Sequence, residues 1–169
     1  MNRVLFVMAQ PFHPWHGTAL RARHTVAALA ALGYAIDVLA PPGGEPPDLP
    51  GVQIIRMPRI LCVRLARSAG VSVCGGYRLL LVVRALSRAL THRYPIVHGV
   101  GAAWPAARLA ARVCKAGLVY ESDPKDPGGA RTAWRLSRAL RRADAVVTAE
   151  ADVIARLRNL GRESRACLI

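Results

Sequence analysis

The sequence predicts an α/β domain in which one parallel sheet carries helices on both faces, a three-layer αβα arrangement. Three observations lead to this class. Short apolar segments recur along the chain, amphipathic segments of helical periodicity separate them, and 53% of the 169 residues are hydrophobic while 20% are charged. Strands that alternate with helices are typical of parallel sheets with right-handed crossovers. The length suits one domain, so we expect residues 1–169 to form a single unit.

Three strands and two helices are expected in the first half of the chain. The first apolar run stops at Pro11, which suits a central strand buried on both faces. After it, Ala22, Val26 and Leu29 recur at helical spacing, and Gly33 is a typical residue to end a helix. The expected strands are residues 4–9, 35–40 and 52–57, and the expected helices are residues 18–32 and 77–90.

The second half repeats the pattern with shorter strands. Pro105 falls in the first turn of an alanine-rich helix, where its missing N–H costs little. The expected strands are residues 96–98, 118–120 and 145–148, the expected helices are residues 102–114, 130–142 and 151–160, and residues 167–169 form a last apolar fragment. Ligands of open parallel sheets bind beyond the carboxyl ends of the strands. The loops expected to carry the site are therefore residues 10–18, 98–103, 121–129 and 148–150.

Composition excludes several classes of protein. The longest unbroken run of Leu, Ile and Val, residues 79–83, is far shorter than the roughly 18 residues of a membrane-spanning helix. Because the amino terminus also lacks a signal-peptide cleavage pattern, we expect a soluble or peripheral protein in the cytoplasm. The four cysteines are scattered, without a Cys-x-x-Cys pair or a histidine at ligand spacing. This predicts buried, reduced thiols, no metal site and no cofactor.

Two phosphate-binding motifs are missing from the chain. Residues 9–14 contain no glycine for the tight turn of a dinucleotide fingerprint, and no Gly-x-x-x-x-Gly-Lys-Ser/Thr loop occurs. The first loop instead ends in His16, Gly17 and Thr18 directly before a helix, where backbone N–H groups and the helix dipole favour an anionic or hydroxyl-rich ligand. The alternative is that Gly17 only permits the turn and Thr18 is an ordinary N-cap.

Several short phrases follow one another in a characteristic order along nearly the whole chain. They are residues 16–21 (HGTALR), 30–38 (AALGYAIDV), 51–58 (GVQIIRMP), 94–98 (YPIVH), 118–121 (LVYE) and 142–148 (RADAVVT). The second is similar to ALxxxGHEVxV and the fourth to PDVVHxH, two phrases of family 4 glycosyltransferases. The chain therefore resembles the amino-terminal domain of that family, whose members have the GT-B fold of two facing Rossmann-like domains.

The resemblance implies a Rossmann-like domain that is a single half of a GT-B fold. Such a half binds the acceptor for retaining transfer of a sugar, of the hexosyl type, from a nucleotide-sugar donor. In the family the carboxy-terminal domain holds most of the donor through a glycine-rich loop and a Glu-x7-Glu motif, and no such glutamate pair occurs here. We therefore expect that the donor-binding domain is absent and that the chain alone is inactive.

The resemblance also implies the residues of the site. His98 is the catalytic candidate, and the substrate-binding candidates are His16, Gly17, Thr18, Arg21, Gly99 and Glu121. An imidazole at the end of a strand suits a hydrogen bond to a hydroxyl or phosphate near neutral pH, although a histidine satisfied within its own loop is the alternative. Glu121 suits acceptor hydroxyls, and a carboxylate that caps the following turn is its alternative.

The basic charge suggests a surface for anionic partners. The formal net charge is +14, from 24 basic and 10 acidic residues. In one segment arginines alternate with Leu, Val and Cys, the pattern of a basic amphipathic surface on anionic lipid, and a solvated helix face is the alternative. Lipid contact would suit a lipid-linked acceptor and a position on the inner face of the membrane. These arginines are Arg56, Arg59, Arg64, Arg67, Arg78, Arg84 and Arg88.

Two other functions stay open at this point. The chain could be a non-catalytic, acceptor- or membrane-binding subunit that works with a separate donor-binding partner chain, as in split GT-B enzymes. A basic nucleic-acid-binding protein ranks third, because aromatic residues make up only 5% and do not alternate with the arginines as a stacking platform requires, so we expect no nucleic-acid partner. Phe12, Trp15 and Trp104 are expected as exposed apolar residues on the face that would meet a second domain.

Overall fold

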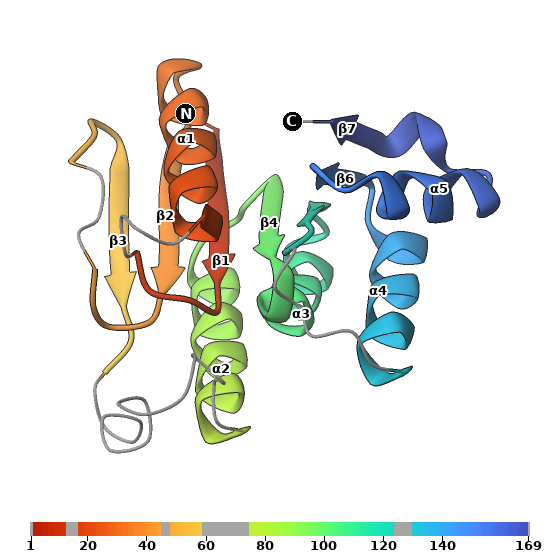
Figure 1. Cartoon of the computed structure of the whole chain (residues 1–169). Coiled ribbons are helices and arrows are strands. Elements are labelled where there is room, and N and C mark those ends of the chain that lie inside the picture. The colour runs from red at the N-terminus through yellow and green to blue at the C-terminus, as the bar shows by residue number, and fades with distance from the viewer. Residues whose placement is uncertain (1, 13–16, 45–47, 59–74, 124–129, 169) are drawn as a thin grey trace.

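The computed structural model of the chain describes residues 2–12, 17–44, 48–58, 75–123 and 130–168. Within them the strands are β1 (Arg3–Met8), β2 (Ala35–Ala40), β3 (Val52–Arg56), β4 (Ile96–Val100), β5 (Gly117–Glu121), β6 (Ala145–Thr148) and β7 (Ala166–Leu168). These strands form one sheet in the order β3-β2-β1-β4-β5-β6-β7 (Figure 1). Every neighbouring pair is parallel, which confirms the predicted fold class.

Helices cover both faces of the sheet. α1 (Gly17–Ala31) packs on one face, where Val26 lies among Phe6 and Val38. The other face, which includes Leu5 and Val97, is covered by α2 (Gly75–Thr91), α3 (Trp104–Cys114), α4 (Ala130–Arg142) and α5 (Ala151–Asn159). Successive side chains of a strand point to opposite faces, so both faces of the central strands are apolar. Two short 3-10 turns, η1 (Gly101–Ala103) and η2 (Glu163–Arg165), precede α3 and β7.

Local chemistry explains where the helices begin and end. Gly33 follows α1 with φ +82°, a conformation that favours glycine, as the sequence predicts. Pro105 occupies the first turn of α3, also as predicted. The predicted start of that helix is wrong by two residues, because Gly101 adopts φ +48° and the segment Gly101–Ala103 forms the tighter η1 turn.

Two strands are longer than predicted, and the difference moves Gly99 and Glu121 from expected loops into strands. β4 continues to Val100, so His98 and Gly99 lie inside the strand, and Glu121 is the last residue of β5. The cause is tertiary. β4 pairs with β1 on one side and with β5 on the other as far as Val100, so the ladder continues through a glycine that interrupts the apolar run.

Several side chains differ from their expected exposure. Phe12 and Trp104 are 3% and 6% exposed, so the prediction of exposed apolar residues there is wrong. The ring of Trp104 instead packs edge-on against Tyr120, with centroids 5.4 Å apart. Cys114 is half-buried and Cys167 is exposed, so burial is wrong for the latter thiol. Trp15, Cys62 and Cys74 lie outside the described residues.

A buried polar cluster near the amino ends of the strands ties α2 to the sheet. Asp37 in β2 is 2% exposed, and its Oδ2 accepts hydrogen bonds of 2.6 Å from both Arg88 and the hydroxyl of Tyr94. Burial and the bond to Asp37 raise the pKa of Tyr94. Burial lowers the pKa of Arg88, but its bonds to Asp37 and Tyr94 outweigh that effect and raise it. This pairing lets a carboxylate occupy a core strand.

Candidate functional site

The candidate site lies where the strand order reverses, between β1 and β4. From β1 the chain winds outward to β2 and β3, and it then returns to β4 on the other side of β1. The connections after β1 and β4 therefore leave toward opposite faces and open a crevice at their carboxyl ends. A cleft of about 10 Å³ lies there, enough for about one water molecule. Its lining includes Met8, Ala9, Gln10, Thr18, Ala102 and Asp123.

Asp123, two residues after β5, joins the parts of this cleft. Its Oδ2 accepts a hydrogen bond of 2.7 Å from Nε2 of Gln10, and its Oδ1 accepts one of 2.8 Å from Oγ1 of Thr18. The residue is 8% exposed, so its carboxylate is held in place but reaches the surface. Gly101 makes this position possible, because a Cβ there would lie 2.8 Å from the Cβ of Asp123.

A second polar cluster adjoins the first on the α1 side of the sheet. Glu121 is fully buried, with Oε2 3.0 Å from Nε2 of His98 and Oε1 3.7 Å from Nε of Arg21. Arg21 also donates a hydrogen bond of 2.9 Å to the carbonyl oxygen of Ser122. The ring of His98 stacks on Phe6 with centroids 4.5 Å apart. The carboxylate of Glu121 therefore links α1, β4 and β5.

Some of the predicted site residues are brought together and others are not. The residues brought together are Thr18, Arg21, His98 and Glu121. Gln10 and Asp123 were missed, although they lie in loops expected to carry the site. Polar residues directly after buried strands were the available signal, since the carboxyl ends of parallel strands share one edge.

The glycine and histidine candidates occupy different surroundings. Gly17 begins α1 and is exposed, with no atom within 4 Å of the position that a Cβ would take. Gly99 faces α3, away from His98, and a Cβ on it would lie only 2.5 Å from the Cβ of Ala107. Its lack of a side chain therefore permits close packing of α3 on β4. His16 lies outside the described residues.

The hydroxyl of Thr148, at the end of β6, takes part in two hydrogen bonds. Oγ of Ser122 donates to Oγ1 of Thr148 at 2.8 Å, and the backbone N–H of Glu150 donates to the same oxygen at 3.0 Å. Glu150 is the N-cap of α5 and makes no side-chain capping bond. The loop after β6 therefore braces the end of β5 beside the cleft.

The electrostatics of the cleft favour hydroxyl groups over phosphate. The first turn of α1 contains no acidic residue, but Thr18 in that turn donates its hydroxyl to Asp123. The negative charge of Asp123 thus already lies near the positive end of the α1 dipole, where it repels a second anion. A carboxylate accepts hydrogen bonds from hydroxyl groups.

Neither a metal centre nor a membrane span is found in the part of the chain that the structure describes. In those residues no three His, Cys, Asp or Glu side chains are grouped so that they could hold a metal ion. The described helices also include none with the length and apolar character needed to cross a bilayer.

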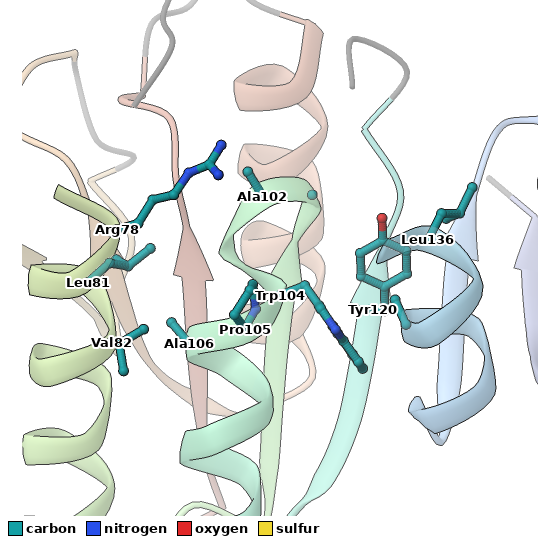
Figure 2. A pocket seen from close by; sticks show the side chains of 11 residues that line it. Arg78, Leu81, Val82, Ala102, Trp104, Pro105, Ala106, Tyr120 and Leu136 are labelled. Carbon is teal, nitrogen blue, oxygen red and sulfur yellow. The ribbon is translucent and has the colours of Figure 1, made fainter. Parts of the chain in front are cut away.

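A larger pocket of about 170 Å³ lies on the opposite face of the sheet, at the same carboxyl edge. Figure 2 shows its walls, which come from α2, the start of α3, the end of β5, and α4. Side chains that line it include Arg78, Leu81, Val82, Trp104, Tyr120 and Leu136. We call it the α2–α4 pocket.

The fold defines the class of the domain, and a comparison with protein families gives its membership. A parallel sheet of this order with a polar cleft at its reversal point is a Rossmann-like α/β domain, the class that includes each half of a GT-B glycosyltransferase. Residues 16–169 match the glycosyl transferase 4-like domain family, and the chain belongs to that family. The resemblance to family 4 glycosyltransferases is thereby confirmed. No curated protein sequence matches the chain significantly.

Solved glycosyltransferase structures share the fold at low sequence identity. A sucrose-phosphate synthase from Thermosynechococcus elongatus is 15% identical with a TM-score of 0.63, over 93% of this chain and 81% of that one. A glycosyltransferase from Rickettsia africae is 18% identical with a TM-score of 0.60, and this chain is covered fully but spans 43% of it. MurG from Acinetobacter baumannii is 19% identical with a TM-score of 0.57, over 90% of this chain and 42% of that one.

Proposed function

We propose that this domain binds the acceptor of a sugar-transfer reaction at the carboxyl edge between β1 and β4. The observation that carries the proposal is Asp123, a carboxylate fixed by Gln10 and Thr18 at the reversal point of the sheet. Ligands of open α/β sheets bind at that point, and a carboxylate is suited to the hydroxyl groups of a sugar or lipid-linked acceptor.

The reaction we propose is retaining transfer from a nucleotide-sugar donor, in a cleft between this domain and a donor-binding domain. The main electrostatic requirement is stabilisation of the leaving diphosphate. The carboxylate of Asp123 is unsuited to that task, and no Glu-x7-Glu pair occurs in the sequence. The donor groups would therefore come from the second domain, and residues 1–169 alone would transfer no sugar. The chain spans less than half of the MurG and Rickettsia structures, which supports this division.

Within this proposal, His98, Glu121 and Arg21 act as positioning residues. His98 and Glu121 are 4% and 0% exposed and are paired with each other, so they hold the middle of β4 and the end of β5 together under α1. Arg21 fixes α1 to the carbonyl oxygen of Ser122, directly before Asp123. The cluster would thereby keep the carboxylate of Asp123 in a fixed position.

Acceptor binding is tested by titrating the chain with a panel of methyl glycosides and following ligand NMR signals. Asp123→Asn should weaken binding about tenfold, since a charged hydrogen-bond acceptor contributes more than a neutral one. Asp48→Asn, at an exposed residue of a loop, is the matched control and should bind like the wild type. Equal affinities for the two variants would contradict the role of Asp123.

Transferase activity is tested separately. The purified 169-residue chain, incubated with a panel of nucleotide sugars and glycosides, should release no nucleoside diphosphate above background. Robust transfer would overturn the proposed division of labour. The alternative is a non-catalytic subunit of a split enzyme. A separate intact gene for a Rossmann-like domain with Glu-x7-Glu would favour that alternative.

We also propose peripheral membrane association, on the inner face of the cytoplasmic membrane. The predicted basic segment supports it only in part, because Arg59, Arg64 and Arg67 lie outside the described residues. Arg88 in that segment is bound to Asp37. The observation that favours association is a surface formed by two helices, which we call the α2–α3 face. Its exposed apolar side chains are Leu79, Val83, Leu90, Leu109 and Val113.

The charge of the α2–α3 face suits anionic lipid. Exposed cations lie on the same helices and directly after them, and the sequence contains no Asp or Glu from residue 49 to residue 120. A second copy of the chain is a poor partner for this face, because two such positive faces repel each other. Nucleic acid is also a poorer partner than lipid, because the exposed leucines suit acyl chains better. The exposed cations are Arg84, Arg93, Arg112 and Lys115.

Vesicle flotation tests this association with phosphatidylcholine alone and with added phosphatidylglycerol. The wild type should float only with the anionic vesicles. Arg84→Glu with Arg93→Glu should weaken binding by more than about tenfold, because each cation near the surface contributes about 1 kcal/mol. The control is the double variant Arg23→Glu with Arg156→Glu, which changes the net charge by the same amount. Both residues are exposed, and they lie on α1 and α5. Equal loss in both pairs, or no flotation of the wild type, would contradict a specific face.

A further inference from the structure

The α2–α4 pocket adjoins the proposed acceptor cleft but takes no part in it. Ala102 of η1 lines both spaces, so a single turn of chain separates them. In Figure 2, Arg78, Ala102 and the hydroxyl of Tyr120 lie at the carboxyl end of the sheet, and Val82 and Ala106 lie further along the helices. A ligand that lies across η1 would therefore contact both spaces.

The pocket walls are largely apolar and partly aromatic. Leu81 and Val82 come from α2 and Leu136 comes from α4, while the rings of Trp104 and Tyr120 meet edge-on. An apolar cavity of about 150 Å³ holds a benzene molecule in another protein. A volume of about 170 Å³ therefore suits an apolar group of that size.

Arg78 adds one charged group to this wall. Its side chain extends from α2 toward Ala102 (Figure 2), and its Nε is buried without a hydrogen-bond partner among the described residues. A buried guanidinium N–H without a partner is unfavourable, and a carboxylate, phosphate or carbonyl oxygen satisfies it. The pocket therefore suits an apolar group that adjoins a hydrogen-bond acceptor.

We infer that the α2–α4 pocket binds an apolar part of the acceptor, of about the size of a benzene ring, next to an anionic or carbonyl group that pairs with Arg78. This inference rests on the proposed function, which places the hydroxyl groups of the acceptor at Asp123. It narrows the acceptor to a glycoside or alcohol that carries an aryl or branched alkyl substituent next to an anionic or carbonyl group, and it excludes a plain oligosaccharide.

The pocket itself is probed with benzoate and benzyl alcohol, titrated against the 169-residue chain and followed by ligand NMR. Both probes should bind. Arg78→Gln should weaken benzoate about tenfold and leave benzyl alcohol nearly unchanged, because only the carboxylate needs the guanidinium. Equal weakening of the two probes would overturn the role of Arg78, and failure of both to bind would overturn the pocket as a site.

Two substitutions that fill the space form the second arm. Val82→Phe places a ring in the pocket and should weaken both probes about tenfold or more. Val83→Phe makes the same change at the next residue, which is 53% exposed, and should bind both probes like the wild type. Ala102→Leu is a second filling variant in case Val82→Phe unfolds, and circular dichroism monitors the fold of each. Loss of binding in Val83→Phe alone would contradict the assignment.

A comparison of phenyl and methyl glycosides separates this inference from the proposed function. The phenyl glycoside should bind about tenfold more tightly, and Val82→Phe should remove that difference without weakening the methyl glycoside. Equal binding of the two glycosides would overturn the inference and leave the acceptor role intact. Binding of benzoate without binding of any glycoside would instead overturn the acceptor role, and with it the assignment of the pocket to the acceptor.

Discussion

Nε2 of His98 lies 3.0 Å from Oε2 of Glu121, and the two side chains are 5% and 0% exposed. The pair joins the middle of β4 to the carboxyl end of the neighbouring β5, and Arg21 extends the connection to α1. Hydrogen-bonded charged groups in a protein interior are costly to break, because the remaining partner stays buried. The arrangement therefore connects the stability of the domain to the shape of its cleft.

Replacement of Glu121 tests this connection. Glu121→Gln keeps the size of the side chain but removes the charge beside Arg21 and brings an amide N–H₂ toward one of its two partners. We expect the free energy of unfolding to fall by about 1–3 kcal/mol, measured by urea denaturation. The control Asp48→Asn removes a charge at an exposed residue and should change the free energy of unfolding by less than about 0.5 kcal/mol. Similar losses in both variants would contradict a structural role for Glu121.

Gly99 is predicted to matter for packing. Gly99→Ala would place a Cβ 2.5 Å from the Cβ of Ala107, so α3 must move away from β4. Overpacking of this kind costs about 1–3 kcal/mol in thermal or chemical unfolding. The double variant Gly99→Ala with Ala107→Gly removes the clash and should recover stability relative to the single variant, apart from about 1 kcal/mol for glycine in a helix. No recovery would indicate a different role for Gly99.

The Asp37 cluster predicts a loss of stability in alkaline solution. The pKa of Tyr94 is raised in the folded state, so above pH 10 the unfolded chain loses this proton while the folded chain keeps it. The contribution of the Tyr94 hydroxyl to the free energy of unfolding is fully present below about pH 10. Above that pH it falls by up to about 1.4 kcal/mol per pH unit. Tyr94→Phe should reduce this slope in denaturation curves between about pH 9 and pH 11. An unchanged slope would contradict the assignment.

Gly101 is predicted to control the position of Asp123. Gly101→Ala forces an alanine into φ +48° and brings its Cβ to 2.8 Å from that of Asp123. We expect weaker binding of methyl glycosides as well as a loss of about 1–3 kcal/mol in stability. Gly161→Ala is the matched control, because Gly161 has φ +65° but no atom within 4 Å of the added Cβ. It should lose stability and keep glycoside affinity.

The order and type of the elements could be predicted because local patterns determine them. Helical spacing of apolar residues identifies α1, for example, and Gly33 marks its end. The ends of elements were harder to predict where tertiary contacts decide them. β4 continues through His98 and Gly99 because strands pair with it on both sides, and single-sequence periodicity does not report that pairing.

The candidate site could be predicted only at the level of loops. Strand topology places the loops after β1, β4 and β5 at one edge, and this general rule applies to any such sheet. The pairing of Thr18 with Asp123 joins residues 105 positions apart and depends on strand register and on the close approach of Gly101. Neither quantity is encoded in a local pattern, so Asp123 was missed.

The central position of β1 has a consequence for synthesis of the protein. β1 is paired with β2 and also with β4, where Val4 lies opposite Ile96. A nascent chain that has not yet emerged to β4 can form only β1–β2–β3, which leaves the backbone N–H and C=O groups on one edge of β1 open to pairing with other chains. Such non-local pairing slows folding and exposes intermediates to aggregation. Ribosome-bound chains that end before β4 would therefore depend on chaperones to stay dispersed.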